Sequence, residues 1–127
     1  MILCDTDVLI DVIRKHPPAV AWASSIAQQE VVIPGYVAMQ LVQGSRSKYD
    51  LQATLTLLKP FRLVWPSSRF CDRALQTLTD FRLSNGLDLV DALIAQTAIA
   101  LQVPLHTFNV KHFEPIPELQ ILQPYQR

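Results

Sequence analysis

The stretch Met1-Ile-Leu-Cys-Asp-Thr-Asp-Val-Leu-Ile-Asp11 joins a short apolar run to a segment with helical spacing. The apolar run, Met1–Cys4, ends at Asp5, and such a run is typical of a strand buried on both faces. The apolar side chains that follow recur at the spacing of one helix face, which predicts a helix over residues 7–15. A buried strand followed directly by a helix is the repeating unit of α/β folds with parallel sheets.

The remaining sequence alternates between short apolar runs and segments with helical spacing, and proline marks most of the boundaries. Further strands are predicted at Val31–Ile33, Phe61–Trp65, Val103–Thr107 and Leu119–Leu122. Further helices are predicted at Pro18–Gln29, from about Val37 to Gly44, and over residues 49–58, 68–84 and 89–101. Short strands that alternate with helices favour an α/β fold with a largely parallel, five-stranded sheet.

Length and composition restrict the classes of protein to be considered. A chain of 127 residues, 50% apolar and 17% charged, is expected to form one domain over residues 1–127 and not to be disordered. No apolar run approaches the ~20 residues that span a bilayer, and the first residues lack the pattern of a secretory signal. Eleven basic and eleven acidic side chains cancel, so contact with nucleic acid would need a local basic patch.

The chain contains two cysteines, Cys4 and Cys71, and both lie in apolar stretches. Two cysteines cannot form a disulfide framework, which favours a reducing compartment and a cytoplasmic location. We expect both to be inert core residues.

Polar side chains stand where the predicted strands end. Asp5 follows the first strand, Gln40 lies in the helix after the second, Asp88 and Asp91 flank the start of the helix at residue 89, and Asn109 follows the fourth strand. Right-handed crossovers between parallel strands place these positions at one edge of the sheet, where ligands of open α/β sheets bind. Carboxylates gathered there raise one another's pKa unless a cation neutralises them. Oxygen ligands of this kind suit Mg²⁺ or Mn²⁺.

Three segments of the chain resemble motifs of the PIN domain family. They are Met1–Asp11, quoted above, Leu87-Asp-Leu-Val-Asp-Ala-Leu-Ile-Ala-Gln-Thr-Ala98, and Leu105-His-Thr-Phe-Asn-Val-Lys-His-Phe113 followed by Ile116-Pro-Glu-Leu. Among PIN domains the sequence is most similar to the VapC toxins of bacterial toxin–antitoxin pairs. The resemblance covers essentially the whole chain and implies a PIN-like three-layer sandwich, with helices flanking a central, mostly parallel five-stranded sheet.

The resemblance also implies an activity and a set of site residues. A VapC-like chain is a metal-dependent endoribonuclease that uses Mg²⁺ or Mn²⁺ on single-stranded or structured RNA, and a small antitoxin protein holds it inactive. By the match to the motifs, Asp5 and Asp91 are metal-binding acids. Asn109 falls at the fourth position of the site, and Thr6 is the small polar residue that helps to hold it. Asp88 is an extra acid that can assist Asp91 with the metal.

The second acidic position departs from the family pattern. Where PIN domains have Glu-Leu-x-x-Gly, this chain has Gln40-Leu-Val-Gln-Gly44, so an amide replaces a carboxylate. At ~5 Å and an effective dielectric constant near 20, one charge against a divalent ion is worth on the order of several kcal/mol before desolvation. We therefore expect a ribonuclease with reduced activity. The alternative is a catalytically weak PIN domain that acts through protein binding, to its antitoxin or to itself.

Basic and apolar side chains suggest further partners. Three cations are candidates for an RNA-binding rim, and ordinary solvated charges are an equally good interpretation: Arg46, Lys48 and Lys111. VapC-like toxins resemble one another in dimerising and in burying an antitoxin helix in an apolar groove. We expect a homodimer here, because a chain this apolar is expected to cover the leucines of the predicted 49–58 helix: Leu51, Leu55, Leu57 and Leu58.

Simpler structural roles compete with several of these assignments. Asp5 and Asp88 stand at helix starts, where aspartate commonly caps the helix. Asp91 suits the first turn of the following helix, because a negative charge there is favourable. Asn109 suits a turn equally well.

Four other polar side chains near these motifs have less specific predictions. Asp7 and Asp11 are expected to be solvated helix residues or to make helix–helix contacts. His106 and His112 lie six residues apart, and we expect packing or RNA contact of them rather than metal ligation.

One competing enzyme class comes from the first motif alone. Cys4-Asp5-Thr-Asp7-Val-Leu also resembles the nucleophile motif of haloacid-dehalogenase-like phosphatases, in which the first aspartate attacks phosphorus and the second acts as acid and base. No later lysine-containing loop and acidic pair match that class, and the chain is short for it. The PIN interpretation is therefore the one that we pursue.

Overall fold

The computed structural model describes residues 1–127, and its centre is a five-stranded sheet in which every neighbouring pair of strands is parallel. The strands are β1 (Ile2–Cys4), β2 (Val31–Pro34), β3 (Arg62–Val64), β4 (Leu105–His106) and β5 (Ile121–Leu122), in the order β3-β2-β1-β4-β5. All three residues of β1 are buried, and Leu3 is opposite Val32 on one side and Leu105 on the other. The predicted five-stranded parallel sheet is confirmed.

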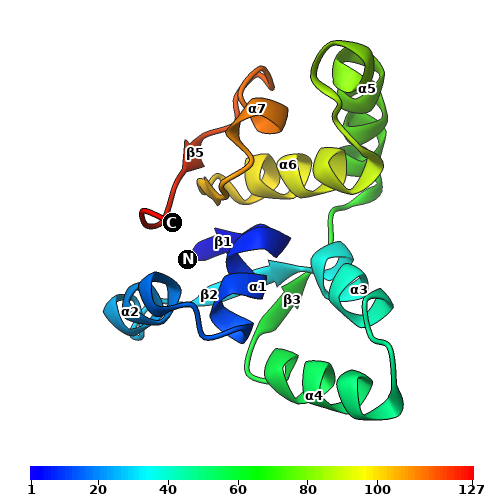
Figure 1. The fold of residues 1–127 in the computed structure, drawn as a ribbon. Helices are drawn as coiled ribbons and strands as arrows, with labels where there is room; N and C mark the ends of the chain where they lie inside the picture. Colours follow the sequence, from blue (N-terminus) through cyan, green and yellow to red (C-terminus); the bar gives the residue numbers. More distant parts are fainter.

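Seven helices cover the two faces of this sheet. They are α1 (Thr6–Ile13), α2 (Pro17–Ser25), α3 (Gly35–Gln43), α4 (Lys48–Leu58), α5 (Ser68–Asn85), α6 (Leu89–Leu101) and α7 (Val110–Phe113). Figure 1 shows α5, α6 and α7 on one side of the sheet and α1, α2 and α4 on the other. Helix α3 contacts both α1 and α6 and so joins the two groups. The predicted three-layer α/β sandwich is confirmed, and none of these helices is both long and apolar enough to cross a membrane.

Several predicted boundaries differ from the structure for identifiable reasons. Helix α1 begins at Thr6 rather than at residue 7, because the Asp5 side chain caps it. Helix α2 ends at Ser25 rather than Gln29, because the following amides bond to carbonyls three residues back, as Gln29 N does to Ile26 O at 2.8 Å. Helix α7 was not predicted, since four residues are too few to show a helical period.

Helix α6 is the segment in which prediction and structure agree at both ends. It is buried on almost every side, as its continuous apolar sequence predicts. Its one long polar side chain, Gln96, donates from Nε2 to Thr77 Oγ1 in α5 at 2.9 Å. This hydrogen bond links α6 to α5.

Candidate functional site

Asp5 lies at the carboxyl end of the central strand β1 and is 6% exposed. Its Oδ1 accepts from Thr6 N at 2.7 Å, and its Oδ2 accepts from the Thr107 hydroxyl at 2.8 Å. The pKa of Asp5 is raised to about 7, mainly by burial and then by the charge of Asp7, with a smaller contribution from Asp91, while these two hydrogen bonds act in the opposite direction. Asp5 is therefore a carboxylate held in place by the protein but short of a compensating positive charge.

Asp91 lies in the first turn of α6 and is also buried. Burial, followed by the charge of Asp88, raises its pKa. Because the charge of Asp91 also raises the pKa of Asp5, the two acids interact electrostatically although 86 positions of the sequence separate them. A chain of contacts through Thr107, Asn109 and His112 also links Asp5 to Asp91 at this edge of the sheet. That the two acids share a metal ion stays a prediction.

Asp88 caps helix α6. Its Oδ1 accepts from Asp91 N at 2.8 Å, and Asp91 Oδ2 accepts from Asp88 N at 3.4 Å, which together form a capping box. The capping interpretation of Asp88 is confirmed. Its assignment as a metal ligand stays a prediction, and its exposed side chain already uses one oxygen for the cap.

Gln40 reaches the site from α3. The Thr6 hydroxyl donates to Gln40 Oε1 at 2.6 Å, and the backbone N–H of Thr6 donates to Asp5 Oδ1. The amide at the second acidic position is thus joined to the first acid through a single residue. These two hydrogen bonds are compatible with the supporting role that the motif match implies for Thr6, which stays a prediction.

Asn109 and His112 complete a chain of contacts between the two acids. Asn109 N donates to the Thr107 hydroxyl at 3.0 Å, and the Asn109 amide Nδ2 lies 2.8 Å from His112 Nδ1. The same Nδ1 lies 3.2 Å from Asp91 Oδ2. A protonated Nδ1 donates to the Asp91 carboxylate, whereas a bare Nδ1 accepts from the amide. Sequence reasoning expected packing or RNA contact of His112 and missed this link.

His106 does not share the position of His112. It lies in β4, half-buried, with its ring 5.7 Å from that of Trp22, and burial lowers its pKa. The packing role expected of His106 is confirmed. Cys4, the residue before Asp5, is fully buried, and burial raises the pKa of its thiol to about 12, so it is an inert core residue as predicted.

The predictions for Asp7 and Asp11 are wrong. Asp7 Oδ2 accepts from Phe108 N at 2.9 Å and lies 3.4 Å from the Thr107 hydroxyl, so this carboxylate belongs to the site. Asp11 is buried and pairs with Arg127 rather than with another helix. Neither partner could be found from local spacing, because each lies about a hundred or more residues away in the sequence.

The predicted basic rim is split between two places. Arg46 and Lys48 are exposed at the α3–α4 connection, and Lys111 is exposed in α7 next to His112. A cavity of about 470 Å³ adjoins the site between α1, α3 and α4, and its lining includes Thr6, Gln40 and a cation that sequence reasoning missed, Arg14. Whether these cations contact RNA stays a prediction.

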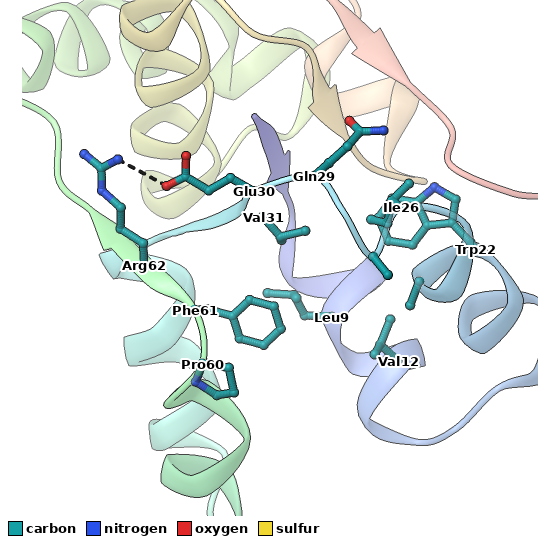
Figure 2. A pocket seen from close by; sticks show the side chains of 12 residues that line it. Leu9, Val12, Trp22, Ile26, Gln29, Glu30, Val31, Pro60, Phe61 and Arg62 are labelled. Atoms are coloured by element: carbon teal, nitrogen blue, oxygen red, sulfur yellow. Dashed lines mark hydrogen bonds and ion pairs between the residues drawn. The ribbon is translucent and has the colours of Figure 1, made fainter.

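A second cavity of about 470 Å³ lies away from the acids, where β2 and β3 begin. Figure 2 shows Leu9 and Phe61 facing each other inside it, with Trp22 at one end. The exposed ion pair between Glu30 and Arg62, with Oε1 and the guanidinium 3.2 Å apart, stands at the other end of it. This cavity is apolar and holds no cluster of acids, so the acidic edge is the candidate site for chemistry.

The donors at the acidic edge suit a partly hydrated Mg²⁺ or Mn²⁺. No group of three His, Cys, Asp or Glu side chains is close enough to enclose a metal ion. Asp5 and Asp91 nonetheless bring two buried carboxylates with raised pKa values, and a cation would relieve their desolvation and mutual repulsion. Mg²⁺ commonly binds through one or two carboxylates and keeps several waters, so the set fits such an ion.

Comparison with known proteins agrees with this architecture. The family model described as "PIN domain" matches residues 2–118. Ribonuclease VapC19 of Mycobacterium tuberculosis is 32% identical, over 94% of this chain and 98% of that protein. Ribonuclease VapC10 of the same organism is 31% identical, over 94% of this chain and 91% of that protein.

Solved structures with the same fold are toxin–antitoxin complexes. A toxin–antitoxin complex from Klebsiella pneumoniae has a chain that matches with a TM-score of 0.78 and 25% identity over the full length of both chains. VapBC2 from Rickettsia felis, bound to a DNA fragment from its promoter, matches with a TM-score of 0.77 and 27% identity, over 96% of this chain and 98% of that one.

Proposed function

The chain belongs to the PIN domain family, and we propose that it is a VapC-type toxin, a metal-dependent endoribonuclease that cleaves single-stranded or structured RNA. The observation that carries the proposal is the chain of contacts that links two buried carboxylates, Asp5 and Asp91, at the carboxyl edge of the sheet. The similarity to two VapC ribonucleases over almost the whole chain supports the choice of substrate.

We propose different roles for the residues at the acidic edge of the sheet. Asp5 and Asp91 would hold Mg²⁺ or Mn²⁺, and Gln40 and Asn109 offer amide groups beside them. A bound divalent ion polarises a phosphate and lowers the pKa of an attacking water. Thr6 N and the Thr107 hydroxyl bond to both oxygens of Asp5 and so fix that carboxylate before any ligand arrives.

Gln40 is the reason to expect a weaker site than a four-acid arrangement gives. The amide keeps a carbonyl oxygen but carries no charge, and that oxygen already accepts from Thr6. Asp7 adds a negative charge that raises the pKa of Asp5, but its own oxygens accept from Val8 N and Phe108 N. We therefore propose that Mg²⁺ binds weakly to the free protein and more tightly once RNA phosphate supplies further oxygens.

The test is cleavage of an end-labelled single-stranded RNA, with Mg²⁺ and with a chelator. Cleavage by the parent protein is expected to need the ion and to fall at least about a hundredfold in Asp5→Asn and Asp91→Asn. Asp72→Asn changes an exposed acid of α5 and serves as the control. Cleavage that survives in Asp91→Asn would overturn the proposal. Absence of cleavage by the parent, with antitoxin binding retained, would favour the second candidate function, a PIN domain that acts by protein binding.

The antitoxin is proposed to lie along α1. The site cavity, a smaller cavity of about 260 Å³ and the cavity of Figure 2 follow one another along α1, and each shares lining residues with the next. Apolar side chains line the smaller cavity: Leu9, Val12, Ile13, Leu57 and Phe61. An amphipathic helix suits such a surface. Leu57→Asp is expected to weaken binding of a candidate antitoxin taken from a small neighbouring reading frame, measured by calorimetry. Unchanged affinity would exclude this surface as the antitoxin site.

A homodimer is proposed through a different face. An apolar hollow of about 630 Å³ lies between α3, α4 and β3, and four of its large apolar side chains are at least 40% exposed: Met39, Leu55, Leu63 and Trp65. Contiguous exposed apolar surface of this kind is typical of an interface. A monomeric mass by light scattering at micromolar concentration would contradict the dimer.

The cytoplasmic location also stays a prediction.

A further inference from the structure

Asp7 and Asp11 lie four residues apart on α1, so their side chains leave the same face of the helix, one turn apart. Each holds a segment from the far end of the sequence. Asp7 Oδ2 accepts from Phe108 N at 2.9 Å. Asp11 forms a bidentate ion pair with Arg127, with Nε–Oδ2 and Nη2–Oδ1 distances of 2.8 and 3.0 Å. The Tyr125 hydroxyl donates to Asp11 Oδ2 at 2.9 Å.

The side chains that Asp11 holds lie over Phe108. The Tyr125 ring meets the Phe108 ring edge-on, with centroids 4.9 Å apart and planes at 64°. The Arg127 guanidinium carbon lies 4.7 Å from the centroid of the same ring. The backbone amide of Phe108 thus bonds to Asp7, and its ring packs against Tyr125 and Arg127, which both bond to Asp11. Asp7 and Asp11 lie on one face of α1.

Phe108 stands between the two residues of its loop that reach the acidic site. Thr107 donates its hydroxyl to Asp5 Oδ2 and accepts from Asn109 N with the same oxygen. Asn109 in turn contacts His112 Nδ1, which lies beside Asp91. A shift of Phe108 is therefore expected to displace both neighbours: Thr107, whose hydroxyl donates to Asp5, and Asn109, whose amide contacts His112.

We propose that Tyr125 and Arg127 are positioning residues of the acidic site, and that with Asp11 they clamp the 107–109 loop against Asp5 and Asp7. The proposal deepens the proposed function, on which its catalytic meaning rests. The geometry favours a clamp over a casual surface contact for two reasons. The Asp11 side chain is only 11% exposed in the presence of Arg127 and Tyr125, and both of its oxygens accept hydrogen bonds from these two residues. The paired contacts with a guanidinium also fix its plane, which a lysine could not do.

Hydrogen exchange of the metal-free protein tests the clamp without requiring any ribonuclease activity. The amides of Phe108 and Asn109 are informative, because their partners are the Asp7 carboxylate and the Thr107 hydroxyl rather than a strand or helix. In Arg127→Ala we expect both amides to exchange at least about tenfold faster, with the amides of β1 and β2 unchanged. Unchanged exchange at 108 and 109, or equal acceleration throughout the sheet, would overturn the proposal.

The chain contains a matched control for this substitution. Arg73 in α5 pairs with Glu118 at 2.7 Å, and its guanidinium lies 5.2 Å from the centroid of the Phe70 ring. It therefore makes the same two kinds of contact as Arg127, with an acid and with an aromatic ring. Arg73→Ala is expected to leave the exchange of the 107–109 loop as in the parent. Equal acceleration of the loop by Arg73→Ala would count against a specific clamp.

A milder variant guards against loss of folding. Tyr125→Phe removes only the hydroxyl bond to Asp11 and keeps the ring on Phe108, so a smaller acceleration confined to the same loop is expected. In the RNA assay, Arg127→Ala is expected to lower kcat while KM changes little, because the clamp orients the site rather than binding RNA. A parent protein that cleaves no RNA would contradict the proposed function. Hydrogen exchange of Arg127→Ala would still test the clamp, because it does not depend on RNA cleavage.

Discussion

The Thr6 hydroxyl donates a 2.6 Å hydrogen bond to Gln40 Oε1, so the neutral residue at the second acidic position is joined to the residue that follows Asp5. A glutamate at position 40 could accept the same hydrogen bond. The amide and the acid therefore differ at this position mainly in charge, which makes the effect of that charge measurable on its own.

Gln40→Glu is expected to tighten Mg²⁺ binding by at least about tenfold and to speed RNA cleavage, because it adds one negative charge beside Asp5 and Asp91. Calorimetric titration with Mg²⁺ and initial cleavage rates measure the two effects. Gln52→Glu places the same charge on exposed α4 and is the control. Equal affinity and rate in Gln40→Glu and the parent would show that the charge at position 40 is irrelevant.

Asp88→Ser separates the cap of α6 from a role in metal binding. Serine caps helices about as well as aspartate, so the free energy of unfolding is expected to change by less than about 0.5 kcal/mol. Mg²⁺ affinity is expected to fall by no more than about tenfold, because the loss of one nearby negative charge weakens the site even though the cap already uses Asp88 Oδ1. Thermal unfolding and a Mg²⁺ titration give both values, and a loss of affinity as large as that in Asp91→Asn would instead support Asp88 as a ligand.

The stability of the metal-free protein is expected to fall as pH rises from about 4 to 7. Asp5 has its pKa raised from its ordinary value of 3.8 to about 7, so the folded chain holds a proton there that the unfolded chain has released. A proton bound more tightly by the folded state stabilises it at low pH, and this contribution is lost as pH rises through the folded pKa.

Asp5→Asn removes this ionisation. As pH rises from 5 to 8 without divalent ions, the variant is expected to gain stability relative to the parent and to show a flatter pH dependence, on top of the pH-independent cost of replacing one acceptor oxygen of Asp5 by an NH₂ group. Urea unfolding between pH 5 and 8 measures it. A parent whose stability rises over this range, with no difference in slope from Asp5→Asn, would contradict the raised pKa.

Lys111→Ala tests the RNA-binding rim. Lys111 is exposed in α7 beside His112, where it can reach phosphate without a competing acid partner among the ion pairs of the structure. Its loss is expected to lower RNA affinity and to reduce the slope of log affinity against log salt by about one unit. Lys59→Ala is the control in the α4–β3 connection. An identical salt slope would remove Lys111 from the rim.

The sequence was sufficient to predict the sheet and the meeting of distant acids. Asp5 follows a buried strand and Asp91 opens a buried helix, and parallel topology brings such positions to one edge whatever the details of packing. The same reasoning placed Gln40 and Asn109 near them. Those four positions depend on the order of elements, which local patterns in the sequence reveal.

The contacts of Asp7, Asp11 and His112 could not be predicted in the same way. Asp7 and Asp11 look like solvated residues of a short helix, because their partners, Phe108 and Arg127, are about a hundred or more residues away. His112 lies on a helix too short to show a period. Which side chain meets which across the edge depends on tertiary packing rather than on spacing.

The central claim is that Asp5 and Asp91 share one divalent ion, and Mn²⁺ binding followed by electron paramagnetic resonance tests it most directly. The parent is expected to bind one Mn²⁺, with affinity at least about tenfold weaker in Asp5→Asn and in Asp91→Asn and unchanged in Asp72→Asn. Parent-like Mn²⁺ affinity in Asp91→Asn would contradict the account.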